Sequence, residues 1–187
     1  LETFSKIKHN FKGSFFDLVD PKVSFDFMLG MFLSIIKKVK WDEGLNKLKN
    51  CDLSNLELYS TFDNTCPHIK IFATSLNSSQ VWFQSKPLSA NMIGEREWSN
   101  LYPFVDSIRI PEVLDLYYSN GLPLLKYLKC KNFALKRFLP NLLLIIFSKK
   151  FIGLKYISFR KHIFPNIFFP NVYIFPFVYL FKKIFLR

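Results

Sequence analysis

The chain has 187 residues, of which 50% are hydrophobic and 18% aromatic, and this amount of apolar side chain excludes an intrinsically disordered protein. Its length suffices for one domain with a core of its own, or for one domain with an appendage. Its three cysteines, Cys51, Cys66 and Cys130, form no Cys-x-x-Cys pair, which argues against a zinc site or a disulfide framework. A reducing compartment is therefore expected, and we predict a cytoplasmic protein, either free or associated with a membrane.

The net charge of +12 is distributed unevenly along the chain. Residues 116–187 contain 13 Lys and Arg and no Asp or Glu, whereas residues 1–115 have a net charge of −1. Such an asymmetry predicts an anionic partner, for example a membrane surface, a nucleic acid or a phosphate-bearing ligand. No zinc-finger spacing or aromatic RNA-binding motif gives a specific nucleic-acid signal. AT-rich codon usage would enrich Phe, Lys, Ile and Asn without selection for binding, and this explanation stays open.

The sequence predicts that the N-terminal part is helical. Apolar residues recur every three or four positions in residues 22–39, which predicts an amphipathic helix. Its continuous apolar part, residues 27–36, is too short to span a bilayer. Asp42 and Glu43 are expected to begin a short second helix.

A small β-hairpin is predicted next. Apolar and polar residues alternate in residues 68–75, and a second run rich in apolar residues covers 80–85. The intervening residues 76–79 are suited to a turn.

Three helices are expected after residue 110. Pro111 suits the first turn of the first helix, which Gly121 would end. Residues 123–138 and 142–147 predict two more, and the last is apolar throughout, which indicates deep burial or contact with lipid. The predicted fold class is therefore mainly α with a small β-hairpin.

Residues 162–181 contain no Asp, Glu, Lys or Arg and match the length of a membrane span. Pro165, Pro170 and Pro176 would each interrupt a helix in this segment. We therefore predict an extended segment that is buried in protein or lies at a membrane interface. Anionic headgroups would suit the three basic residues that follow, Lys182, Lys183 and Arg187.

Most catalytic signatures are missing from the sequence. The six glycines make neither a dinucleotide-binding fingerprint nor a phosphate-binding loop. Neither a zinc-protease motif nor a serine elbow is found. His9, His68 and His162 stand apart from any Ser or Cys at the spacing of a nucleophilic motif.

Five sequence blocks within residues 82–153 nevertheless follow a known order. They are a polar stretch with Met and Glu, a Pro-Phe-x-Asp turn, a Lys-containing helix, a Leu-Pro pair and a Lys-rich loop with Gly and Phe, at residues 91–97, 103–106, 125–129, 139–140 and 149–153. In order and spacing, this stretch resembles the C-terminal portion of the synthetase domain in asparagine synthase-like enzymes. Glu97 departs from the pattern because it stands six residues before Pro103, where the family usually has four. The Ser-Gly-Gly-x-Asp-Ser pyrophosphate loop and the N-terminal cysteine nucleophile of the family are missing.

The resemblance implies a C-terminal fragment of an ATP-dependent amidotransferase that is inactive alone. The implied fold is the helical end of an α/β ATP-pyrophosphatase-like domain, with ATP and Mg²⁺ as cofactors and the remainder of the parent chain as partner. The family places a lysine after the Pro-Phe-x-Asp turn, close to the pyrophosphate, and Lys126 matches that position. An ammonium group there would stabilise developing negative charge. The alternative for Lys126 is a solvated lysine on a helix face, and Asp106 is expected to cap a helix rather than bind metal.

The resemblance also sets the expected domains. They are a helical segment at 1–60, the asparagine synthase-like portion at 61–153 and a Phe/Pro-rich basic tail at 154–187. The alternative function is a non-catalytic basic module that docks on a membrane surface or on a protein. Residues 71–77 with Trp82-Phe83 also resemble a strand pair of patatin-like phospholipases, although the serine elbow is missing.

Overall fold

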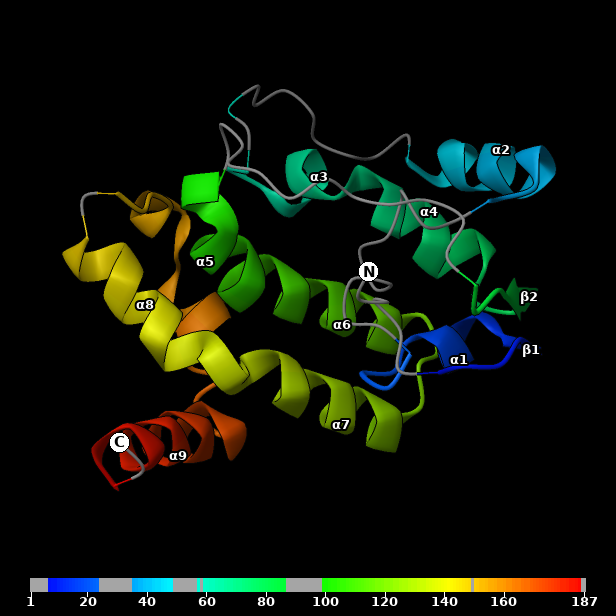
Figure 1. Cartoon of the computed structure of the whole chain (residues 1–187). Helices are drawn as coiled ribbons and strands as arrows, with labels where there is room; N and C mark the ends of the chain where they lie inside the picture. The colour runs from blue at the N-terminus through cyan, green and yellow to red at the C-terminus, as the bar shows by residue number, and fades with distance from the viewer. Residues whose placement is uncertain are drawn as a thin grey trace. The chain divides into compact units, whose positions relative to one another are not determined.

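The computed structural model describes residues 7–23, 35–48, 57, 59–86, 99–148 and 150–185, and this part of the chain is mainly helical (Figure 1). The mainly-α prediction is therefore confirmed. The chain divides into two compact units. The N-terminal unit comprises Leu1–Gly94 and Val113–Tyr127, and the C-terminal unit comprises Glu95–Glu112 and Leu128–Arg187.

The N-terminal unit contains a two-stranded antiparallel sheet. Strand β1 (Phe11–Ser14) pairs with β2 (Gln80–Phe83). Phe11 lies opposite Phe83, and their rings stack with centroids 5.1 Å apart. The strand expected at 80–85 is thus confirmed over four residues, but its partner comes from the beginning of the chain rather than from residues 68–75.

The strand predicted at 68–75 is wrong, because this segment forms helix α4 (Pro67–Ser75). Pro67 occupies its first turn, where the missing N–H costs no hydrogen bond. Ile69, Ile71 and Phe72 are all buried, so more than one side of the helix is covered. A short apolar run of this kind cannot be assigned to a buried strand or a buried helix by periodicity alone.

Helix α2 (Lys38–Lys47) packs against α4 at a glycine (Figure 1). Gly44 is buried, and a Cβ atom there would overlap the side chain of Ile71. The helix start predicted at Asp42 is wrong, because α2 is already helical from Lys38. Of the helix predicted at 22–39, residues 24–34 lie outside the described residues.

We predict that Gly44→Ala lowers the free energy of unfolding by up to about 2 kcal/mol. Overpacking a tight contact costs about 1–3 kcal/mol, whereas the better helix propensity of Ala returns about 1 kcal/mol. Urea unfolding measures the difference. The control is Asn46→Ala at an exposed position of the same helix. This substitution raises the helix propensity without creating the overlap with Ile71. Equal stability of the two variants would contradict this packing.

A capped turn precedes α4. Helix α3 (Phe62–Thr65) begins after Thr61, whose hydroxyl accepts a hydrogen bond from the Asn64 backbone N–H at 3.2 Å. The carboxylate of Asp63 then pairs with Lys70 of α4 at 2.5 Å. This ion pair fixes the orientation of the two helices at Cys66.

An aromatic cluster forms the core of the N-terminal unit. Phe15 and Phe16 of α1 (Phe15–Leu18) pack edge-on against Tyr117, at ring distances of 5.7 and 6.0 Å. Tyr117 is fully buried, and this burial raises the pKa of its hydroxyl. Phe72 joins the cluster through Phe15.

Tyr117 belongs to a helical run of three elements. These are α5 (Tyr102–Phe104), the π-helical turn η5 (Val105–Arg109) and α6 (Ile110–Ser119). Asp106 lies inside this run, so its predicted role as a cap is wrong: the helix begins before it. Gly121 adopts a φ of +106°, and the predicted helix end there is confirmed.

The other two predicted helices are also confirmed. Helix α7 (Leu124–Ala134) continues through the 3-10 turn η6 (Leu135–Arg137) into α8 (Phe138–Phe147). The described chain then forms the short turns η7 (Leu154–Tyr156) and η8 (Phe159–Ile163).

The C-terminal segment differs from the prediction. Residues 171–185 form helix α9 (Asn171–Phe185), not an extended segment, and Pro176 lies inside it. Pro170 immediately precedes the helix and so interrupts nothing. A single proline removes one hydrogen bond, and packing of α9 against η6 and α8 offsets that cost. Among the described residues, none of the helices combines the length and hydrophobicity needed to cross a membrane.

Candidate functional site

Lys126, the residue singled out by the resemblance, lies in the first turn of α7. Its Nζ is 3.6 Å from Oδ1 of Asp17, and 22% of its side chain is exposed. The other oxygen of Asp17 accepts a hydrogen bond of 2.8 Å from the Ser14 backbone N–H at the start of α1. This hydrogen bond, with a smaller contribution from Lys126, lowers the pKa of the Asp17 carboxyl. In this geometry Lys126 joins α7 to α1, and its catalytic role stays a prediction.

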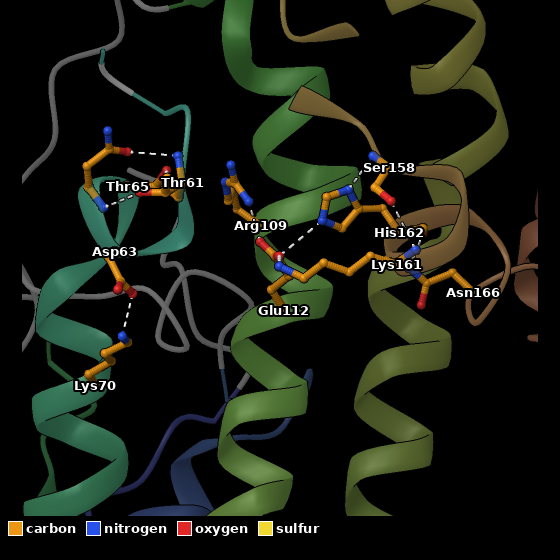
Figure 2. Close-up of polar contacts among 11 residues, drawn as sticks. Thr61, Asp63, Thr65, Lys70, Arg109, Glu112, Ser158, Lys161, His162 and Asn166 are labelled. Carbon is orange, nitrogen blue, oxygen red and sulfur yellow. Dashed lines mark hydrogen bonds and ion pairs between the residues drawn. The ribbon is translucent and has the colours of Figure 1, made fainter. Parts of the chain in front are cut away.

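A largely buried carboxylate, that of Glu112, has several partners in the C-terminal unit. Oε1 of Glu112 lies 2.7 Å from Lys161 Nζ and 3.2 Å from His162 Nε2, and Oε2 lies 2.5 Å from Arg109 Nη1 (Figure 2). Both oxygens therefore have cationic or hydrogen-bonding partners. Nδ1 of His162 accepts a hydrogen bond of 2.9 Å from the Ser158 backbone N–H. This contact leaves the ring proton of neutral His162 on Nε2, directed at Glu112.

The surroundings determine how Glu112 titrates. Burial raises the pKa of its carboxyl, but the hydrogen bond from His162, the charge of Arg109 and the hydrogen bonds from Lys161 and Arg109 outweigh burial and lower the pKa to about 2. Glu112 is consequently an anion at neutral pH, with its lone pairs engaged. It is a poor general base, and its role is to hold η8 against the start of α6.

Sequence reasoning treated His162 as isolated, because its partner is 50 positions away in the chain. No short motif links the two residues. The only signal was that Glu112 and Asp115 are the last acidic residues before a long basic segment.

The described residues contain no cluster of three or more His, Cys, Asp or Glu side chains that could hold a metal ion. Cys66 and Cys130 are buried and are not part of a disulfide. The Mg²⁺ and ATP implied by the resemblance stay predictions.

The surface of the C-terminal unit is rich in exposed apolar side chains. On α8, 79% of Phe147 is exposed, and Leu143, Leu144 and Ile146 are exposed beside it. On α9, 75% of Phe177 is exposed, together with four more residues that we group with it as the α9 face: Tyr173, Ile174, Val178 and Phe181. Single exposed apolar residues are ordinary, but neighbouring ones on a helix mark a binding surface.

A shallow open groove lies near the start of α9. It has a volume of about 500 Å³ and is lined mainly by apolar atoms of Leu128, Lys129, Asn132, Phe168, Phe169 and Pro170. Asn132 also binds α9, because its side-chain oxygen accepts from the Asn171 N–H at 2.9 Å and its carbonyl accepts from the Asn171 side chain at 3.0 Å. These two hydrogen bonds, the Asn132 clamp, fix the first turn of α9.

We expect Asn132→Ala to loosen that turn. The variant loses the acceptor of the Asn171 N–H, at a cost of about 1 kcal/mol. Hydrogen exchange at the start of α9 should accelerate by about fivefold, which is the same free energy expressed as a rate. Exchange in α4 of the N-terminal unit should stay unchanged, and faster exchange throughout would indicate a general loss of stability instead.

Comparison of the chain with protein-family models, with curated proteins and with solved structures finds no match.

Proposed function

We propose that the C-terminal unit binds the surface of an anionic membrane. The observation that carries the proposal is the exposure of apolar residues on two neighbouring helices, α8 and α9, in a region that has no acidic residue after Asp115. Apolar side chains beside cationic ones are the surface that lipid headgroups and the first acyl carbons require.

The charge of the unit supports an anionic partner. Its sequence contains 14 Lys and Arg but only four Asp and Glu. One of these acids, Glu112, is buried and paired, so it contributes little negative potential at the surface. A basic residue near an anionic bilayer contributes about 1 kcal/mol to binding. Three such residues would favour anionic over neutral lipid by about a hundredfold.

Lipid fits this surface better than other anionic or apolar partners. The exposed set includes aliphatic residues such as Leu143, Ile146 and Ile174, which provide no stacking platform for nucleic-acid bases. A second copy of the unit would bring the same positive charge to the contact, which opposes self-association. A bilayer supplies both apolar volume and negative charge.

Co-sedimentation of the full chain with vesicles tests the proposal. We expect the chain to pellet with vesicles that contain phosphatidylserine and to stay in the supernatant with pure phosphatidylcholine. Added salt should release it, because exposed charges are screened within about 10 Å at 0.1 M. Equal binding to both vesicle types, or to neither, would overturn the proposal.

The second candidate function is that of the C-terminal fragment of an asparagine synthase-like amidotransferase. It rests on the order of the five sequence blocks, with Lys126 as the residue near pyrophosphate. The reading frame upstream of Leu1 tests it. An open frame that encodes a Ser-Gly-Gly-x-Asp-Ser block would support this function, and an open frame without one would contradict it.

A further inference from the structure

We infer that α9 lies in the plane of the membrane surface and inserts the α9 face among the first acyl carbons. This inference rests on the proposed function and identifies the element of the C-terminal unit that enters the lipid.

Helical geometry places the five residues of the α9 face together. Tyr173, Ile174, Phe177, Val178 and Phe181 follow the spacing at which side chains share one side of a helix. At about 100° per residue they cover an arc of about 140°. All five are exposed, and the arc contains no charged residue.

The opposite side of α9 faces the protein. Val172 is fully buried, and α9 packs against η6 and α8. Pro176 shares this side, about 40° from Val172. Because Pro176 has no N–H, the carbonyl of Val172 loses its usual helical partner. A backbone carbonyl without a partner is costly in hydrocarbon, and Val172 lies outside the exposed arc.

The length and attachment of α9 favour an in-plane orientation. Its 15 residues span about 22 Å, which is less than the hydrocarbon thickness of about 30 Å. The Asn132 clamp ties its first turn to α7.

A fluorescent probe on the α9 face tests the inference. Cys66 and Cys130 are buried, so a Cys51→Ser background limits labelling to an added cysteine. We would attach the environment-sensitive dye NBD at Phe177→Cys. The matched control is Leu125→Cys on α7 of the N-terminal unit, where 82% of the residue is exposed. The Cys51→Ser chain without an added cysteine supplies the background signal.

On vesicles containing phosphatidylserine, we expect the emission of the probe at 177 to shift to the blue, and lipids with a nitroxide near the headgroup to quench it. The probe at 125 should keep the emission of a dye in water. Pelleting of the chain while the probe at 177 stays in water would overturn the inference and leave the proposed function standing. Failure of the Cys51→Ser chain, which keeps Phe177, to pellet with these vesicles would overturn both. A blue shift at 177 without vesicles that grows with protein concentration would assign the α9 face to a second copy.

Discussion

Phe177→Asp is expected to lower the partition of the chain onto anionic vesicles by about a hundredfold. Burial of a Phe side chain is worth about 1.5–3 kcal/mol, and a carboxylate near anionic headgroups reverses an electrostatic gain of about 1 kcal/mol. Each 1.4 kcal/mol changes an equilibrium tenfold, so the combined loss corresponds to about two orders of magnitude. The measurement is a lipid titration followed by co-sedimentation.

The matched control is Leu125→Asp. Leu125 is as exposed as Phe177, but it lies in the N-terminal unit, and the substitution introduces the same charge. We expect its partition to change less than threefold, which is the effect of one added charge without the loss of a lipid-facing Phe. Circular dichroism would check that both variants remain helical. Equal losses for the two variants would show that binding follows net charge alone and would contradict a role for the α9 face.

Glu112→Gln is expected to lower the free energy of unfolding of the C-terminal unit by about 3 kcal/mol. Removing one partner of a buried ion pair leaves the other charge without compensation, which typically costs 3–5 kcal/mol. Arg109 is 2% exposed, so solvent cannot take the place of the carboxylate. Glu43→Gln is the control, because Glu43 and Lys40 are 45% and 39% exposed. Their surface pair should contribute less than about 1 kcal/mol, and urea unfolding compares the two variants.

Glu112→Gln is also expected to change how the free energy of unfolding depends on pH. In the folded chain the pKa of Glu112 is about 2, below its ordinary value of 4.5, so folding favours the ionised form. Its contribution to stability is therefore fully present above about pH 4.5 and is lost as the pH falls towards 2. The stability difference between wild type and Glu112→Gln should shrink over this interval. A difference that stays constant from pH 6 to pH 3 would contradict the buried ion pair.

The helical part of the fold was largely predictable where local signals were strong. Gly121 marks the end of a helix by its backbone chemistry, and the apolar run of α8 is continuous. The helix start predicted at Pro111 is wrong, because the helical run already begins with α5. The strand prediction for residues 68–75 is wrong because the burial of this segment comes from partners distant in sequence, including α2 at Gly44. The extended segment predicted around Pro176 is wrong for a related reason, because tertiary packing offsets the loss of the hydrogen bond that this proline removes.

The candidate site was predictable in character but not in geometry. Charge counting indicated an anionic partner for residues after Asp115, but only the structure places Tyr173, Phe177 and Phe181 on one exposed side of α9. The Glu112–His162 contact was not predictable, because it joins residues that no motif spans. Lys126 was chosen by resemblance, which carries no information about its contact with Asp17.

The most direct test of the account is the partition coefficient of the full chain, measured while the anionic fraction of the vesicles rises at constant total lipid. A basic apolar surface predicts a steep increase with anionic lipid, by about a hundredfold between neutral and strongly anionic vesicles, and a loss of that increase at high salt. A partition coefficient that does not depend on the anionic fraction would contradict the proposal that the C-terminal unit is a membrane-surface module.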